Sequence, residues 1–405
     1  MKIITFLKEI LKFLLSIFPL GAKNFLLSLN DLSSSTFFIK REERSVEDLE
    51  IFVKDDNSLL HLEESYRWSI KKGWMFFPEL AVLHKLSQIK VLEKDDLEFF
   101  KNCVGNNTLK IHPDEINKKY RKICSNYAEH LVSVKEGDPI LIMPTDNENT
   151  ARINSFYKRY KPIFNMIEKK LNVNFSKNDS ILEIGYESGG HSLFALEKLG
   201  FNVTGIDNGY SGLRLVSLIP EKIKKSINSN AQFVLGDITK KTSFDSEHFK
   251  AINSIAVLEH ILDLPLAFQE MHRILKPGGI MLHSYDPFFH PAGGHSLGVL
   301  DFPWGHLQLN SNEYKRYIQQ FRPLEVSHAL NWYNNGVHKK YPKRLMMQLI
   351  LDSGFEILHW NTRKIDHSQR SRISNDLLAN VFKNYPEISE DDLLACEHTF
   401  VAQKI

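Results

Sequence analysis

The segment at residues 181–191, Ile-Leu-Glu-Ile-Gly-Tyr-Glu-Ser-Gly-Gly-His, combines glycines with a helix start in a way that suits ligand binding. Glycine has no Cβ, so the backbone N–H groups at Gly185 and Gly189 can approach a ligand closely, near the positive end of the following helix. Asp207 closes the next apolar run, where its carboxylate can accept hydrogen bonds from both hydroxyls of a ribose. Asp237 closes the run after that, where it can meet an adenine amino group. These residues predict a nucleoside-binding site.

Short apolar runs alternate with helical stretches around these residues. Strands are predicted at 180–184, 203–206, 233–235, 251–255, 280–284, 355–360 and 399–403. Helices are predicted at 154–171, 191–199, 265–275 and 344–351, with a turn at 277–279. This alternation is typical of a parallel sheet with helices on both faces. Such a sheet brings the glycine turn, Asp207 and Asp237 to one edge.

Five segments resemble those of the class I S-adenosylmethionine-dependent methyltransferases, in that family's order and at its spacings. They are 182–191, Val203-Thr-Gly-Ile-Asp207, Gly236-Asp237, Val257-Leu-Glu-His260 and Arg273-Ile-Leu-Lys-Pro-Gly-Gly279. The resemblance covers residues 154–284 firmly and the last strands loosely. It implies an α/β fold: a Rossmann-like class I methyltransferase sheet with helices on both faces, here with a mostly helical N-terminal region and a lid insertion. It also implies an enzyme that uses S-adenosylmethionine.

The resemblance assigns roles to single residues. Glu183 would orient the loop and a ribose or methionine group, and Gly185 and Gly189 would admit the methionine moiety. Asp207 would hold the ribose, Asp237 and Ile238 the adenine, and Val257 would lie near the reacting sulfonium. The full set of implied cofactor contacts is Glu183, Gly185, Tyr186, Glu187, Gly189, Asp207, Asn208, Asp237, Ile238 and Val257.

One position departs from the family pattern, because Glu187 stands where the middle glycine of Gly-x-Gly-x-Gly is usual. If the backbone at 187 has negative φ, the side chain is tolerated and its carboxylate can bind the methionine ammonium. Otherwise the side chain blocks the pocket, and the protein is a methyltransferase-fold interaction module without a cofactor. We expect the first, since Asp207, Asp237 and both flanking glycines are present.

Methyl transfer is an in-line displacement at a sulfonium, so the enzyme must align its acceptor and, for a hydroxyl, remove a proton. A neutral imidazole suits that task. We expect His295 or His306 to be the base, with His260 as a further candidate. Glycine and proline around His295 and His306 predict fixed turns that present them over the cofactor. The alternative is that these histidines make only structural hydrogen bonds.

No metal site is predicted. Glu259-His260 resembles part of a metal site in quinone-biosynthesis O-methyltransferases, but Ala256 stands where that site supplies another carboxylate. The three cysteines are too widely spaced for a zinc site or a disulfide framework, which favours a reducing compartment; they are Cys103, Cys124 and Cys396.

Residues 285–343 form an insertion far longer than the roughly 4–6 residues of an ordinary connection. An insertion at the carboxyl edge of a sheet usually covers a substrate. Its aromatic residues can line an acceptor pocket or form a small core of the insertion itself, and the second alternative is the more common one. They include Phe288, Phe289, Trp304 and Trp332.

The Gly-Gly-His at 293–295 and the Pro-Trp-x-His at 303–306 loosely resemble bacterial methyltransferases of surface-polysaccharide pathways. The resemblance implies O-methylation of a hydroxyl on a sugar or lipid-linked glycan. The alternatives are N- or C-methylation of a small metabolite, quinone-type O-methylation, and the non-catalytic module.

The chain has 405 residues and a formal charge of +2, too balanced to indicate nucleic-acid binding. Residues 1–22 predict an amphipathic helix that either lies in a membrane interface or packs on the protein. Residues 23–150 predict a mostly helical region of unknown role, and 151–405 the methyltransferase domain. We expect a cytoplasmic protein, peripheral at the inner face of the membrane if that helix binds there.

Overall fold

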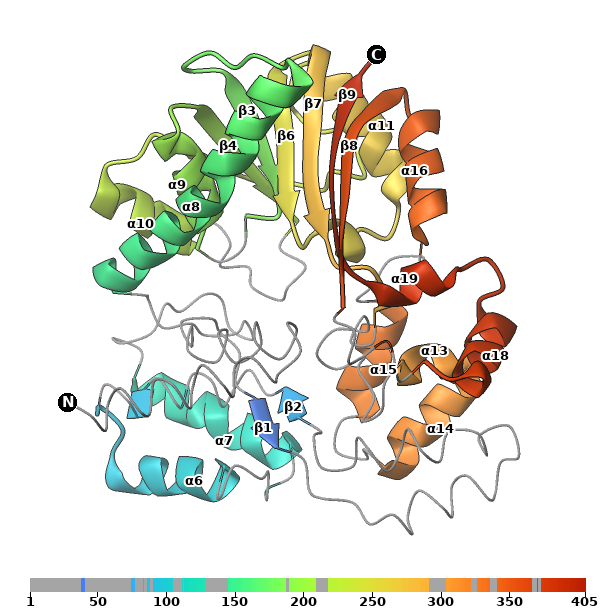
Figure 1. Cartoon of the computed structure of the whole chain (residues 1–405). Helices are drawn as coiled ribbons and strands as arrows, with labels where there is room; N and C mark the ends of the chain where they lie inside the picture. Colours follow the sequence, from blue (N-terminus) through green and yellow to red (C-terminus); the bar gives the residue numbers. More distant parts are fainter. Residues whose placement is uncertain are drawn as a thin grey trace, which may run out of the picture.

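The computed structural model describes residues 90–104, 113–127, 145–186, 189–208, 218–290, 304–321, 326–335, 341–365 and 373–405, with short pieces at 38–40, 74–76, 83, 86–87, 111 and 370. Figure 1 shows a central sheet with helices packed against it and a second group of helices beyond one end of the strands. Residues 1–22, predicted as an amphipathic helix, lie outside the described residues. In the part of the chain that is described, no helix is long and apolar enough to cross a bilayer.

Within the described residues, seven strands form one sheet in the order β5-β4-β3-β6-β7-β9-β8. Their bounds are β3 Ser180–Ile184, β4 Asn202–Asp207, β5 Gln232–Leu235, β6 Phe249–Ile255, β7 Leu275–Tyr285, β8 Phe355–Lys364 and β9 Ala395–Lys404. The strands from β5 to β7 pair in parallel, whereas β9 runs antiparallel to both β7 and β8. The predicted Rossmann-like fold is confirmed. The sheet is mixed rather than wholly parallel, because β9 enters between β7 and β8 from the opposite end.

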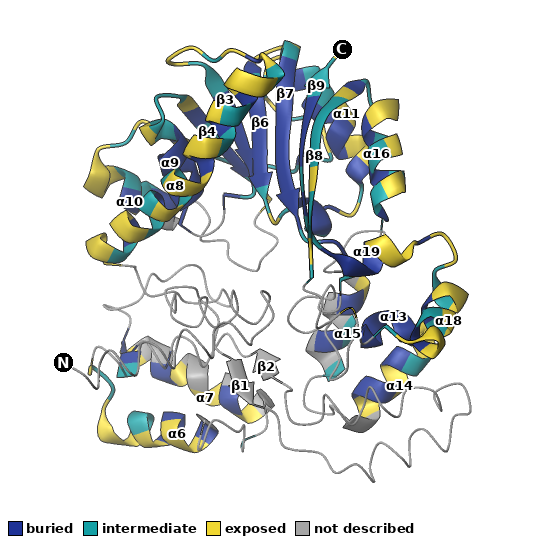
Figure 2. Ribbon diagram, in the orientation of Figure 1, coloured by how far each residue is buried: buried dark blue, intermediate teal, exposed yellow. Residues whose placement is uncertain are grey.

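Helices cover both faces of the sheet, and their buried stripes face it (Figure 2). One face packs against α8 (Asp146–Leu171), α9 (His191–Lys198) and α10 (Leu218–Ile227), the other against α11 (Leu264–Ile274) and α16 (Lys343–Asp352). Successive residues of a strand point to opposite faces, so Ile181 lies in the core under α8 while Leu182 lies in the core under α11. The sheet is therefore packed between two apolar cores, one on each of its faces.

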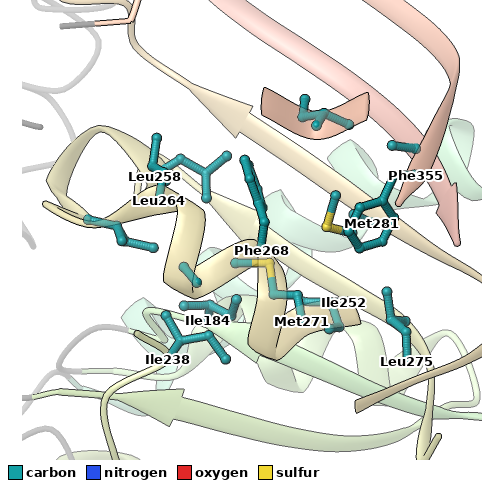
Figure 3. Packing of buried hydrophobic residues seen from close by; sticks show 14 of the residues in the cluster. Ile184, Ile238, Ile252, Leu258, Leu264, Phe268, Met271, Leu275, Met281 and Phe355 are labelled. Atoms are coloured by element: carbon teal, nitrogen blue, oxygen red, sulfur yellow. The ribbon is translucent and has the colours of Figure 1, made fainter. Parts of the chain in front are cut away.

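Helix α11 illustrates this packing. Asp263 precedes the helix, and its side chain accepts a hydrogen bond from the Leu266 N–H at 3.3 Å. Phe268 and Met271 are fully buried and lie among Ile252 and other side chains of the sheet (Figure 3). Burying one side chain of this size contributes about 1.5–3 kcal/mol. The predicted helix at 265–275 is confirmed to within one residue.

Strand β7 begins earlier than predicted. The sequence Pro277-Gly278-Gly279 predicts a turn, yet β7 runs without a break from Leu275. The pairing between β6 and β7 shifts register after Phe249, so the three residues form an irregular part of the strand instead of a turn. Gly278 has φ +65°, which explains why glycine stands there.

The helices beyond the carboxyl ends of the strands form a second unit, here called the cap. It consists of α13 (Gly305–Gln308), α14 (Ser311–Phe321), α15 (Val326–Asn335), α18 (Asn375–Asn384) and α19 (Glu390–Leu394). The first three belong to the predicted insertion. The last two lie between β8 and β9, a connection that the sequence analysis left without structure. Two separate insertions therefore build one cap.

The cap has its own apolar core. Phe288, Phe289 and Trp304 are at most 1% exposed and pack with Leu393 of α19. The indole N–H of Trp304 donates to the Leu393 carbonyl at 3.2 Å. The expectation that these aromatic residues form the insertion's own core is confirmed, whereas the side chain of Trp332 lies outside the described residues.

Helix α8 starts before the predicted position of residue 154. A capping box fixes this start: Thr145 Oγ1 accepts from the Glu148 N–H at 3.3 Å, and Glu148 Oε2 accepts from the Thr145 N–H at 2.8 Å. The boundary predicted between residues 150 and 151 therefore falls inside a helix. Farther upstream, in the region predicted to be mostly helical, the structure has α6 (Lys94–Val104) and α7 (Pro113–Asn126). Two three-residue strands, β1 (Phe38–Lys40) and β2 (Trp74–Phe76), precede them.

Candidate functional site

The turn between β3 and α9 brings backbone within reach of a ligand. Gly185 has φ +72°, and its N–H donates to the Ile206 carbonyl at 2.8 Å, which ties the turn to β4. A Cβ at Gly185 would overlap Val257 Cγ2 and lie 3.0 Å from Cγ1. A Cβ at Gly189 would overlap the imidazole ring of His191. Packing therefore restricts both positions to glycine.

His191 begins α9, and helix α8 holds its ring. His191 Nε2 lies 2.8 Å from Asn149 Oδ1, and both side chains are buried. Burial, and to a smaller extent the charge of Arg152, lowers the pKa of His191 to about 4. The ring is therefore neutral near pH 7, and its Nε2–H donates to the asparagine.

Asp207 and Asn208 follow β4 beside the glycine turn. Ile184 pairs with Ile206 in the parallel register, so the residues after β3 and after β4 emerge at the same edge. The Gly236 N–H donates to the Asp207 carbonyl at 2.9 Å, which fixes the backbone there. Asp207 is half-buried and Asn208 is exposed. The structure thus brings Asp207 to the turn, and its contact with a ribose stays a prediction.

Asp237 is engaged with its own loop. Its Oδ1 accepts hydrogen bonds from the Thr239 N–H at 2.9 Å and the Thr239 hydroxyl at 2.7 Å, and Lys240 Nζ lies 3.3 Å from Oδ2. Partial burial opposes ionisation, but the bonds from Thr239 and Lys240 outweigh it and lower the pKa of Asp237. Ile238 is buried in the core under α11. These two residues shape the loop, and their contact with an adenine stays a prediction.

Tyr186 supports the turn from within the core. Its side chain is 1% exposed, and its ring packs 5.1 Å from that of Phe233. Its hydroxyl has no hydrogen-bond partner among the described residues. A contact of Tyr186 with the cofactor stays a prediction. Glu187 lies outside the described residues, so both expectations for its carboxylate stay predictions.

After β6 the chain turns across the edge of the sheet at Val257 and the short helix η4 (Leu258–His260). Val257 packs against Gly185, while the Ala256 N–H donates to the Ser284 carbonyl at 2.7 Å. The Asp286 N–H donates to Glu259 Oε1 at 3.3 Å. This turn therefore connects the glycine turn with the end of β7.

Two carboxyl groups meet at that connection. Burial, and next the charge of Asp286, raises the pKa of Glu259 well above its ordinary value. Burial, and next the charge of Glu397, raises the pKa of Asp286 to about 6, although Arg363, Arg159 and His260 act in the opposite sense. Near neutral pH, the pair therefore favours the protonated form of Glu259, the fully buried member.

Glu397 of β9 joins the pair to two arginines. Its Oε1 accepts from Arg159 Nη2 at 2.9 Å and from the Ser284 hydroxyl at 2.5 Å, and its Oε2 accepts from Arg363 Nε at 2.9 Å. Burial opposes ionisation of Glu397, but these bonds outweigh it and lower its pKa. We call this set the acid–arginine cluster; its members are Glu259, Asp286, Glu397, Arg159 and Arg363. Only Glu259 of this cluster stands in a motif. Arg159 and Glu397 are 238 positions apart, so their contact has no local signal in the sequence.

Asp286→Asn is expected to stabilise the protein near pH 7.5. The folded-state pKa of about 6 lies above the ordinary 3.8, so the folded chain binds this proton more tightly than the unfolded chain. The stabilisation from Asp286 is complete at low pH and is lost as the pH rises through about 6, a change on the order of 1–3 kcal/mol. Urea denaturation should show this gain for the variant near pH 7.5 and none near pH 4. The exposed control Asp245→Asn should gain nothing, and a less stable Asp286→Asn near pH 7.5 would contradict the expectation.

The candidate bases occupy different places. His306 is fully buried in the cap, and its Nε2 lies 2.8 Å from the Phe288 carbonyl. This contact agrees with the alternative that the histidine makes a structural hydrogen bond. His306 can reach an acceptor only if the cap opens. His260 lies in η4, close enough to Asp286 to influence its charge. His295 lies outside the described residues. Among those that are described, no group of three or more His, Cys, Asp or Glu side chains is placed to hold a metal ion.

Comparison with known proteins adds to this geometry. Residues 182–283 match the family model described as "Methyltransferase domain". This segment is similar to a methyltransferase domain. It contains β3 to β7 and all the cofactor residues expected from the sequence. Such a domain implies S-adenosylmethionine as its cofactor, and the residues present fit it, because the glycine turn follows β3 and Asp207 ends the neighbouring parallel strand β4 at the same edge of the sheet.

Relatives of the methyltransferase domain differ in their substrates. Phosphoethanolamine N-methyltransferase 1 of Zea mays is 31% identical over 114 residues, 28% of this chain and 21% of that protein. Ubiquinone biosynthesis O-methyltransferase of Actinobacillus pleuropneumoniae is 29% identical over 168 residues, 41% of this chain and 67% of that protein. Geranyl diphosphate C-methyltransferase of Streptomyces coelicolor, in a solved structure, is 14% identical with a TM-score of 0.39, covering 68% of this chain and 89% of that one. The alignment thus spans only about a fifth of the maize protein.

Proposed function

We propose that the protein is an S-adenosylmethionine-dependent methyltransferase acting on a small-molecule acceptor. The observation that carries the proposal is the junction of Gly185 and Asp207: the Gly185 N–H donates to the carbonyl of Ile206, the residue before Asp207. A glycine turn and a carboxylate so joined suit the two ends of one nucleoside-bearing ligand. The bound cofactor supplies an activated methyl group. The chain's own residues bind it, orient the acceptor and remove a proton where the acceptor needs it.

The acceptor is proposed more narrowly as a hydroxyl of a sugar or lipid-linked glycan. The support is the Gly-Gly-His at 293–295 and the Pro-Trp-x-His at 303–306, which loosely resemble methyltransferases of surface-polysaccharide pathways. The names of the relatives include N-, C- and O-methylation, so they favour a small molecule without selecting its atom. A small metabolite methylated at nitrogen, carbon or a quinone-type oxygen is the second candidate, favoured by those same names.

For a hydroxyl acceptor, we propose His295 as the base, with His260 as the alternative beside Asp286. Replacing the proposed base His295 should lower turnover by roughly 10²–10⁴-fold while cofactor binding persists. Incubation with cell extracts and S-adenosylmethionine labelled in its methyl group, followed by mass analysis of labelled products, identifies the acceptor and the methylated atom. Labelled sugars or glycolipids support the narrower proposal, and labelled amines, quinones or carbon skeletons replace it.

Isothermal titration with S-adenosylmethionine tests the proposed function directly. We expect wild-type protein to bind, and Asp207→Asn to bind about 10- to 150-fold more weakly, because the amide keeps one oxygen acceptor and the one charge-assisted hydrogen bond that is lost contributes about 1.5–3 kcal/mol. The exposed Asp245→Asn serves as the control and should bind as wild type does. No binding by wild type at millimolar cofactor would remove the proposal in favour of the non-catalytic module.

A further inference from the structure

Helix α8 contacts both ends of the cofactor turn through buried polar side chains. Tyr160 donates its hydroxyl proton to Glu183 Oε1 at 3.2 Å, in the last part of β3. Eleven residues earlier, Asn149 contacts His191 at the start of α9. Eleven residues are about three helical turns, so Asn149 and Tyr160 lie on one face of α8. The helix thus spans the turn from the strand before it to the helix after it.

The hydrogen bonds around Tyr160 fix the direction of its proton. Asn253 of β6 donates its side-chain N–H to the Tyr160 oxygen at 2.8 Å. A hydroxyl has a single proton, and with Asn253 acting as donor that proton is directed to Glu183. Tyr160, Glu183 and Asn253 are each at most 1% exposed, so water does not compete for these bonds.

We infer that Tyr160 is a positioning residue for the cofactor, which holds the Glu183 carboxylate in the orientation that receives the cationic amino-acid arm. The inference rests on the proposed function and deepens it. A buried carboxylate is costly unless it is hydrogen-bonded and matched by opposite charge. The tyrosine supplies one such hydrogen bond, and Glu183 lies two residues before Gly185 of the turn, so its negative charge suits the ammonium of the amino-acid arm. Asp207 stands at the end of the neighbouring strand, so Asp207 would bind the ribose of the ligand and Glu183 its amino-acid arm.

Two ligands that differ only in that arm test the inference. S-adenosylhomocysteine carries the amino-acid arm, whereas 5′-methylthioadenosine ends in a methyl group and keeps the same nucleoside. Tyr160→Phe should weaken binding of S-adenosylhomocysteine about tenfold, since one hydrogen bond to a charged group is lost. Binding of 5′-methylthioadenosine should stay within about twofold of wild type. Tyr157→Phe, a change of the same kind on the same helix, is the matched control and should alter neither affinity.

A double-mutant cycle shows whether Tyr160 acts through Glu183. If it does, adding Tyr160→Phe to Glu183→Gln should weaken S-adenosylhomocysteine binding no further than Glu183→Gln alone. Equal weakening of both ligands, or full additivity in the cycle, would mean that Tyr160 only braces the fold, and would overturn the inference. Wild-type binding with an unchanged Tyr160→Phe would overturn the inference and leave the proposed function standing. Failure of wild type to bind either ligand would overturn both.

Discussion

Gly185→Ala is expected to abolish cofactor binding and to lower the free energy of unfolding by about 2–4 kcal/mol. Two effects add at this position. Gly185 has φ +72°, a conformation that costs a residue with a Cβ roughly 1–2 kcal/mol. The new methyl group would also overlap Val257 Cγ2, and relief of that overlap moves either the turn or the Val257 segment. Because both segments border the expected methyl-transfer site, we expect at least a hundredfold loss of S-adenosylhomocysteine affinity by titration.

Two further variants separate strain from overlap. The double variant Gly185→Ala/Val257→Ala removes the overlap and leaves the strain, so it should recover part of the stability and part of the affinity. Gly200 has φ +103°, yet the nearest atom to a Cβ there is Lys177 Cγ at 3.9 Å. Gly200→Ala should therefore lose stability from backbone strain alone and keep its affinity. Wild-type affinity in Gly185→Ala would show that the turn does not contact the cofactor.

Lowering the pH from about 7.5 to about 5 is expected to remove roughly 2 kcal/mol of stability through each of three buried histidines. Burial is the main cause that lowers the pKa of His283 to about 3 and those of His191 and His398 to about 4. Each is depressed below the ordinary 6.5, so the unfolded chain binds these protons more readily and stability is lost as the pH falls below about 6.5. Each group contributes roughly 2 kcal/mol by pH 5. Protonation of Asp286 and Glu259, whose pKa values are raised, opposes this change, so the net loss is smaller than the sum over the histidines.

Urea denaturation at both pH values measures this acid sensitivity. His283→Gln removes one of the three groups, so its loss of stability between the two pH values should be about 2 kcal/mol smaller than that of wild type. His248 is exposed, so His248→Gln should leave the dependence as it is in wild type. The same loss in His283→Gln as in wild type would contradict the expectation.

The sheet and the cofactor turn were predictable because their signals are local. Each predicted strand of the methyltransferase domain is an apolar run of a few residues, and the glycines at 185 and 189 stand where the backbone conformation and the neighbouring side chains demand them. The extension of β7 through Pro277-Gly-Gly was not predictable from the same signals. It depends on a register shift against β6, which is a property of two strands together.

The cap and the acid–arginine cluster could not be predicted, since both depend on contacts between distant parts of the chain. Trp304 is buried by Leu393 of α19, and Glu397 of β9 is bound by Arg159 of α8. Leu393, Glu397 and Arg159 stand in no recognisable motif, and the Pro-Trp-x-His motif around Trp304 does not indicate which residues bury its ring. The sequence could not rank the candidate bases for a related reason. Only the fold distinguishes His306, which is enclosed in the cap, from His260 at the edge of the sheet.

The capping box at Thr145 has a practical consequence for any shortened version of the protein. A chain trimmed at the predicted boundary of residue 151 would begin inside α8, without the Thr145–Glu148 cap and without Asn149, the partner of His191. The first helix of such a fragment would fray, and the start of α9 would lose its anchor. A shortened version that keeps these contacts therefore has to include Thr145, so part of the region 23–150 is structurally continuous with the sheet domain.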